Sequence, residues 1–202
     1  MNRQLLINTI PFEISPQVVL ESLEKNNGKL VVQGVLQRAN ALNQNGRKYP
    51  KSVLEREAVK YADTFVREHR ALGELDHPET SIVNLRNASH NVVKLWWEGD
   101  DLCGTVEILG TPSGNILKEL FRAGIRLGIS SRGLGSVKET AHNQVEVQDD
   151  FELIAFDFVS NPSTHGAFLN PVTEGKVIEQ KINQRYVKIN EIITDILMEI
   201  SK

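Results

Sequence analysis

The chain has 202 residues, a length that suits one domain of ordinary size and can bury a real core. Hydrophobic residues make up 40% and charged residues 24%, the balance of a soluble globular protein, and a formal net charge of -3 gives no general reason to expect nucleic acid or an anionic membrane as a partner. The single cysteine, Cys103, excludes a disulfide scaffold and a four-cysteine zinc site, and no run of about 18 apolar residues predicts a transmembrane helix.

The first half of the chain contains one clear strand and one clear helix. Residues 1–28 are mixed in character and end in an Asn-Asn-Gly turn. Residues 29–38 are rich in valine and leucine and predict a strand. Beyond a polar loop, apolar residues at helical spacing predict an amphipathic helix over 50–70, and residues 71–91 have the composition of a loop.

The second half predicts shorter elements joined by tight turns. In chain order they are a hairpin of strands 92–98 and 102–109, a helix from Pro112 to Gly124, strands at 127–138, 143–148 and 151–160, a loop at 161–172 and a helix at 174–200. Interspersed strands and helices with tight turns predict an α+β fold, a largely antiparallel β-barrel or sheet surrounded by helices. We expect one domain over residues 1–172 and a helical C-terminal tail over residues 173–202.

Motifs for cofactors are missing from the sequence. No glycine-rich phosphate loop opens a helix after a strand, and no two of the five histidines are spaced to share a helical metal site. The sequence therefore predicts no metal and no other cofactor.

Two segments carry the residue types of nucleophilic catalysis. LGELDHP at 72–78 places His77 between an acid and a proline, on a loop after a helix. GISSRGLGS at 128–136 places a serine pair in a glycine-rich strand, where backbone N–H groups stay accessible to a ligand. A serine hydroxyl needs a nearby base, and histidine is the usual one because its pKa lies near neutrality.

A third group would have to orient the imidazole, and Asp157 is one candidate. It lies in the apolar segment FELIAFDFVS, where a carboxylate without a partner would be costly. Glu74 or Asp76 could serve instead, and Asp157 would then bond to nearby backbone or pair with an arginine such as Arg132.

Together, the segments resemble the prohead core proteases of large tailed bacteriophages, which are related in fold to the herpesvirus assemblins. NGRKYPKSVLEREA, LGELDHP, VKLWWEGDDLCG, RAGIRLGISSRGLGS and DFVSNPS occur in the family's order and cover roughly residues 30–170. The resemblance implies an assemblin-like serine endopeptidase that acts in the prohead interior, in the host cytoplasm, on capsid and scaffold precursor proteins and on itself. It is compatible with a homo-oligomer and implies neither a nucleic-acid nor a membrane partner.

Carried over by motif, the catalytic histidine is His77 and the nucleophile is Ser130, the first serine of the pair. The backbone N–H groups of Arg132 and Gly133 are the candidates for the oxyanion hole. Assemblins use a second histidine as the third catalytic group, and Asp157 stands on the comparable strand here. The family tends to cut after a glutamate preceded two residues earlier by leucine or isoleucine, which makes Leu197-Met198-Glu199 a candidate site of self-cleavage.

Two rival interpretations stand beside the protease. The first is a non-catalytic structural or scaffold protein of the capsid interior that keeps the protease fold. The second is a nucleic-acid-binding module, for which the basic residues of the tail would have to form one face, although glutamates lie among them.

Overall fold

The structure is a computed structural model that describes residues 3–12, 15–43, 45–76, 78, 80–125, 127–140, 144–160 and 169–171. The chain divides into a unit over Met1–Val172 and a second unit over Thr173–Lys202. The helix expected at 174–200 lies in the second unit, outside the described residues, and stays a prediction.

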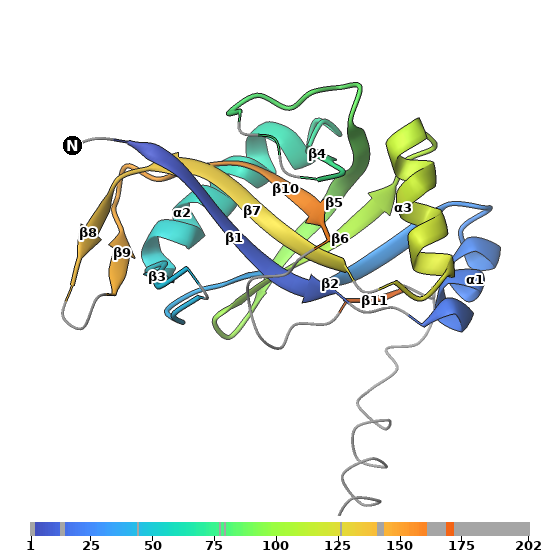
Figure 1. Ribbon diagram of the computed structural model, residues 1–202, viewed down its shortest axis with the longest axis horizontal. Coiled ribbons are helices and arrows are strands. Elements are labelled where there is room, and N and C mark those ends of the chain that lie inside the picture. Colours follow the sequence, from blue (N-terminus) through green and yellow to red (C-terminus); the bar gives the residue numbers. More distant parts are fainter. Residues whose placement is uncertain are drawn as a thin grey trace, which may run out of the picture. The chain divides into compact units, whose positions relative to one another are not determined.

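The first unit combines three helices with eleven strands in its described part (Figure 1). The helices are α1 (Pro16–Lys25), α2 (Lys51–Tyr61), which continues into a π-helical turn over Ala62–Val66, and α3 (Pro112–Arg122). The strands are β1 (Gln4–Phe12), β2 (Leu30–Arg38), β3 (Arg47–Lys48), β4 (Leu72–Glu74), β5 (Ala88–Glu98), β6 (Asp101–Ile108), β7 (Leu127–Gly135), β8 (Val137–Glu139), β9 (Val145–Val147), β10 (Glu152–Val159) and β11 (Leu169–Pro171).

The strands are mostly antiparallel and form three sheets. Their orders are β1-β7-β10, β11-β2-β6-β5-β4 and β3-β9-β8, with β3 and β9 parallel to each other. An isolated parallel bridge between Leu75 and Phe158 links the end of β4 to β10. The expected α+β fold with largely antiparallel sheets is confirmed, while a closed barrel is not formed by the strands that the structure describes.

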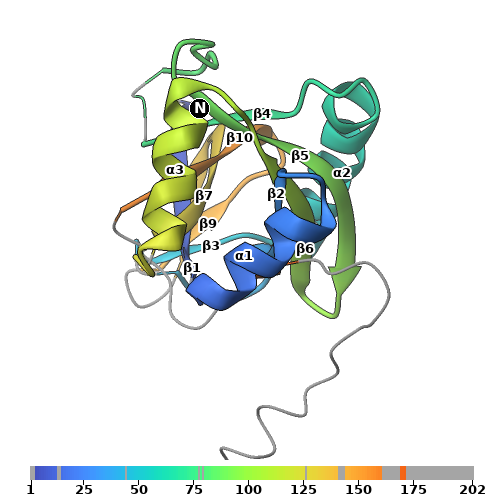
Figure 2. The same cartoon turned by 90° about the vertical axis from the view of Figure 1, so that its right-hand side faces the viewer.

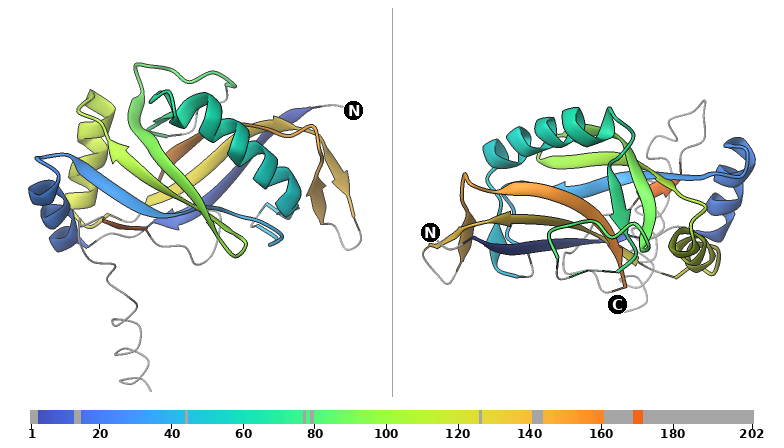
Figure 3. Two further views of the ribbon diagram at one scale, coloured as in Figure 1. Left: turned by 180° about the vertical axis from the view of Figure 1, so that it is seen from behind. Right: turned by 90° about the horizontal axis from the view of Figure 1, so that it is seen from above.

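Buried hydrophobic side chains from the β1-β7-β10 sheet, the β11-β2-β6-β5-β4 sheet and all three helices form one core cluster. Figure 2 shows how these strands and helices are arranged. Helix α2 packs against β10, α3 packs against β5 and β6, and α1 packs against β2. The β8–β9 hairpin projects at the end of this unit opposite α1 and α3 (Figure 3). The central strand β7 is paired along both edges, with β1 on one side and β10 on the other. This pairing fixes the face of the sheet to which each β7 side chain points.

Several predicted elements are confirmed, because their local signals agree with the tertiary structure. The β5–β6 hairpin turns at Gly99, whose φ of 59° favours glycine. Helix α3 begins at Pro112, and the Thr111 hydroxyl caps it by accepting a hydrogen bond of 3.1 Å from the Gly114 N–H.

Four segments differ from the sequence prediction. Residues 1–28 form β1 and α1, the polar loop before the helix predicted at 50–70 contains the two-residue strand β3, the loop predicted at 71–91 contains β4 and the start of β5, and the loop predicted at 161–172 contains β11. Each missed strand pairs with another strand of the chain: β1 with β7, β3 with β9, β4 with β5 and β11 with β2. Local composition does not report such pairing.

Candidate active site

Pairing between β7 and β10 brings the predicted nucleophile and the predicted third group together. Ser130 lies directly opposite Asp157 in the antiparallel register. Side chains at directly opposed positions point to the same face, with Cβ atoms about 5 Å apart. Both residues are fully buried, with an exposed fraction of 0%.

The two serines of the pair face opposite sides of the sheet. Side chains alternate along a strand, so Ser130 shares its face with Arg132, and Ser131 shares its face with Ile129. Ser131 is opposite Phe156, a fully buried core residue, and its Oγ has no hydrogen-bond partner among the residues that the structure describes. Ser130, the residue that the sequence motif selects, therefore lies on the polar face of β7, and Ser131 lies on the face toward the core.

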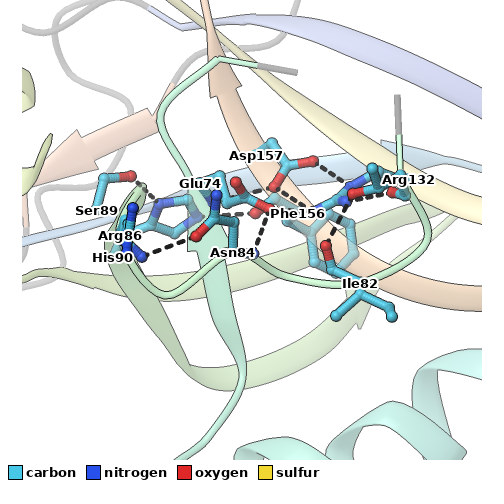
Figure 4. A network of polar contacts seen from close by, with 10 residues as sticks. Glu74, Ile82, Asn84, Arg86, Ser89, His90, Arg132, Phe156 and Asp157 are labelled. Atoms are coloured by element: carbon cyan, nitrogen blue, oxygen red, sulfur yellow. Dashed lines mark hydrogen bonds and ion pairs between the residues drawn. The ribbon is translucent and has the colours of Figure 1, made fainter. Parts of the chain in front are cut away.

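A buried guanidinium organises this polar face (Figure 4). Arg132 Nε donates to Asp157 Oδ2 at 2.8 Å, and Nη2 contacts Asp157 Oδ1 at 3.2 Å and Glu74 Oε1 at 3.1 Å. Its third nitrogen, Nη1, donates to the Thr80 carbonyl at 2.6 Å. Arg132, Glu74 and Asp157 are all fully buried, so these ion pairs are screened far less by solvent than surface pairs are.

The segment that precedes His77 is held against β10. Asp157 Oδ1 accepts a hydrogen bond of 3.0 Å from the Glu74 N–H, and Asp76 N donates to the Phe158 carbonyl at 2.7 Å. Asp76 has a φ of 70°, a left-handed conformation that aspartate tolerates better than most residues. His77 itself lies outside the described residues. Its neighbour Asp76 is hydrogen-bonded to β10, the strand that carries Asp157. Strand β10 in turn pairs with β7, the strand that carries Ser130.

A glycine and a second histidine complete the packing around β4. A Cβ on Gly73 would lie 1.9 Å from the Phe156 carbonyl and 2.2 Å from His90 Nε2, so only glycine allows this close approach. His90 Nε2 donates to the Phe156 carbonyl at 2.9 Å, which leaves Nδ1 to accept from the Ser89 hydroxyl at 2.9 Å. Burial lowers the pKa of His90 to about 4, so this imidazole is neutral at physiological pH.

The comparisons with known proteins agree with this geometry. The family model for the prohead core protein serine protease matches residues 14–177. The chain is also 35% identical over 190 residues to the prohead core protein protease of Enterobacteria phage T4, covering 87% of this chain and 89% of that protein. The chain belongs to the prohead core protease family. The bacteriophage T4 capsid assembly protease is similar in structure, with a TM-score of 0.69 and 28% identity over 80% of this chain and 100% of that one.

Membership of the prohead core protease family makes the chain a protease of capsid maturation. The structure also shows where the two residues predicted to form the oxyanion hole lie. Arg132 and Gly133 are in the central strand β7, between β1 and β10. A bulge in β10 between Leu153 and Ala155 interrupts the regular register directly opposite these two residues. Bulges are frequent beside active sites, where they free backbone groups from regular pairing. The assignment of these N–H groups to an oxyanion hole stays a prediction.

Within the ranges that the structure covers, this prohead core protease has no group of three or more histidine, cysteine or acidic residues that could hold a metal ion. In the same ranges, no helix is long and apolar enough to cross a membrane.

Sequence reasoning anticipated one contact of Asp157 and missed another contact of Arg132. It named the Arg132–Asp157 pair as an alternative, and the structure contains that pair together with a bond from Asp157 to backbone. It missed the ion pair between the Arg132 side chain and Glu74. The available signal was a lone arginine in a glycine-rich strand, because a charged side chain in such a strand needs a buried partner.

Proposed function

We propose that the chain is a serine endopeptidase that cleaves scaffold and capsid precursor proteins inside the prohead, in the host cytoplasm. Ser130 is the nucleophile, His77 the base and Asp157 the group that orients the imidazole. The observation that carries the proposal is the register that sets Ser130 opposite Asp157, with Asp76 bonded to the same strand. Family membership supports the protease chemistry.

The chemical step is acyl transfer to water. The Ser130 Oγ forms a bond to the scissile carbonyl carbon while its proton moves to an imidazole nitrogen of His77. The C–N bond then breaks, and the imidazolium gives the proton to the leaving amine. Water attacks the acyl-enzyme, His77 accepts its proton, and the proton returns to Ser130 as the C–Oγ bond breaks. Backbone N–H groups of Arg132 and Gly133, opposite the β10 bulge, are the proposed donors to the oxyanion.

Asp157 and Arg132 have complementary parts in this proposal. An aspartate that orients a catalytic histidine must stay ionised in a buried site. Two hydrogen bonds from the guanidinium and one from the Glu74 N–H satisfy that carboxylate without neutralising it by proton transfer. The same contacts prevent the carboxylate from rotating.

A matched pair of serine variants tests the proposal. Ser130→Ala should lower cleavage of a capsid or scaffold precursor by about 10³-fold or more, and His77→Ala should do the same. Ser131→Ala is the control, because it removes a neighbouring hydroxyl that faces the core and should keep full activity. Undiminished cleavage by Ser130→Ala would falsify the nucleophile assignment and favour a structural protein with the protease fold.

A further inference from the structure

The loop between β4 and β5 carries two apolar side chains that face solvent. Ile82 and Leu85 have exposed fractions of 77% and 71%, more than any other large hydrophobic residue in the part of the chain that the structure describes. Exposed apolar side chains that are scattered singly need no explanation, whereas these two lie three residues apart on one loop. The loop therefore presents apolar surface to water at one place.

Hydrogen bonds within the loop order the backbone beneath these side chains. Thr80 Oγ1 donates to the Ile82 carbonyl at 3.0 Å. The Asn87 N–H donates to the Asn84 carbonyl at 2.9 Å, which closes a turn around Leu85. A ligand that binds an ordered loop loses less affinity to conformational entropy than one that must order the loop first. The backbone of this loop is therefore suited to presenting Ile82 and Leu85 to a ligand.

The loop is tied to the candidate active site through Arg132 (Figure 4). Its Nη1 donates to the Thr80 carbonyl at 2.6 Å, and Nε of the same guanidinium donates to Asp157 at 2.8 Å. Asp157 in turn lies opposite Ser130. Ile82 follows Thr80 by two residues, a length of at most roughly 7 Å, and its side chain points away from the buried cluster. One side of the loop therefore contacts the site, while the other side displays an apolar side chain.

Two further contacts hold the other end of the loop. Glu74 Oε1 accepts a hydrogen bond of 2.9 Å from the Asn84 N–H, one residue before Leu85. The Leu75 N–H donates to the Asn87 carbonyl at 3.1 Å, where the loop leads into β5. Loops that a rigid scaffold holds beside a site commonly carry the residues that select a ligand. An extended peptide advances about 3.3 Å per residue, so three residues of a substrate cover about 10 Å.

We propose that Ile82 and Leu85 are specificity-determining residues that bind an apolar side chain of the precursor peptide close to the bond that is cut. This inference rests on the proposed function, because it requires a peptide bond to be cleaved at Ser130. Contact with the peptide removes apolar surface of both partners from water, which stabilises the bound substrate. Neither residue touches the reacting atoms, so both act on KM and not on kcat.

Serine variants of the full chain test the proposal through the kinetics of precursor cleavage. Ile82→Ser and Leu85→Ser each remove most of one apolar side chain, so each should raise KM about tenfold and leave kcat near the wild-type value. Leu20→Ser is the matched control, because Leu20 is 51% exposed and lies in α1, which packs against β2. This control should keep the wild-type KM.

A double-mutant cycle identifies the substrate side chain that the loop binds. The masses of the cleavage products locate the bond that is cut, and each apolar residue within about four positions of it is replaced by serine in turn. One of these substrate changes should raise KM about tenfold for the wild-type chain and have little further effect on Ile82→Ser or Leu85→Ser. Additive effects for every substrate change would overturn the proposal, because the two side chains would then not be in contact.

Labelling with a small fluorophosphonate separates substrate binding from catalysis and from folding. This probe has no peptide chain to contact the loop, so Ile82→Ser and Leu85→Ser should react at Ser130 at the wild-type rate. If labelling falls together with cleavage, or if these variants and their alanine counterparts fail to fold, the loop has a structural role and the inference is wrong.

The remaining outcomes distinguish this inference from the proposed function. A wild-type KM for both serine variants overturns the inference and leaves the proposed function standing. A wild-type KM with a changed oligomeric state also overturns it, because the loop would then be an interface between copies of the chain. If Ser130→Ala keeps cleaving the precursor, the proposed function is wrong and the inference is wrong with it.

Discussion

Replacement of Arg132 by methionine tests the buried cluster most severely. Methionine has a similar length and no charge, so Arg132→Met removes every contact of the guanidinium and leaves Glu74 and Asp157 buried without their cation. Removing one partner of a buried ion pair typically costs about 3–5 kcal/mol. Because two carboxylates lose the same partner here, we expect a loss of about 5 kcal/mol in the free energy of unfolding.

Equilibrium unfolding in urea, followed by the fluorescence of Trp96 and Trp97, measures this loss. With a slope of about 2 kcal/mol per molar urea, the midpoint should fall by about 2.5 M. Arg38→Met is the matched control, because Arg38 makes the same two-point contact with Asp101 in a half-exposed position. It should cost about 1 kcal/mol or less.

A compensated variant separates charge from packing. Arg132→Met combined with Glu74→Gln and Asp157→Asn leaves no charge in the cluster and should recover most of the lost stability. The reasoning would be refuted by equal losses for Arg132→Met and Arg38→Met. It would also be refuted if the triple variant were no more stable than the single one.

Three further predictions concern His90, Gly73 and the end of the chain. The pKa of His90 is about 4 in the folded state, against an ordinary value of 6.5 for an exposed imidazole. Between these pH values the unfolded chain binds a proton that the folded chain does not bind. The free energy of unfolding should therefore fall by about 3 kcal/mol as the pH drops from about 6.5 to about 4. Urea midpoints measured across this range should fall less steeply for His90→Gln, and an equal slope would contradict the assignment. Gly73→Ala should cost about 3 kcal/mol in thermal or urea unfolding because its Cβ meets a carbonyl oxygen at 1.9 Å, whereas Gly110→Ala, with no atom within 4 Å, should be nearly neutral. Self-cleavage after Glu199 should appear as a smaller intact mass after incubation of the wild-type chain and should be absent from Ser130→Ala; an unchanged wild-type mass counts against it.

The sequence predicted the parts of the fold that depend on short-range signals. The β5–β6 hairpin and helix α3 were predicted because Gly99, Pro112 and Gly124 mark their ends locally. Strands β1 and β4 were missed because each is defined by pairing with a strand elsewhere in the chain. Short strands of this kind have little periodicity of their own.

The catalytic roles read from the sequence stay predictions, and the sequence does not reveal the connections between the residues. The motifs selected Ser130 and His77, and an acid in an apolar strand drew attention to Asp157. The juxtaposition of Ser130 and Asp157 depends on the register between β7 and β10, which no local pattern records. The contact between Arg132 and Glu74 spans 58 residues, so it became visible only when β4 was placed beside β10.

The most direct test of the proposed nucleophile is covalent labelling with a fluorophosphonate, which reacts with an activated serine. The wild-type chain is digested after labelling, and fragmentation in a mass spectrometer distinguishes an adduct on Ser130 from one on Ser131. We predict an adduct on Ser130 that is lost in His77→Ala and retained in Ser131→Ala. An adduct on Ser131, or labelling of Ser130 that survives His77→Ala at the wild-type rate, would contradict the account.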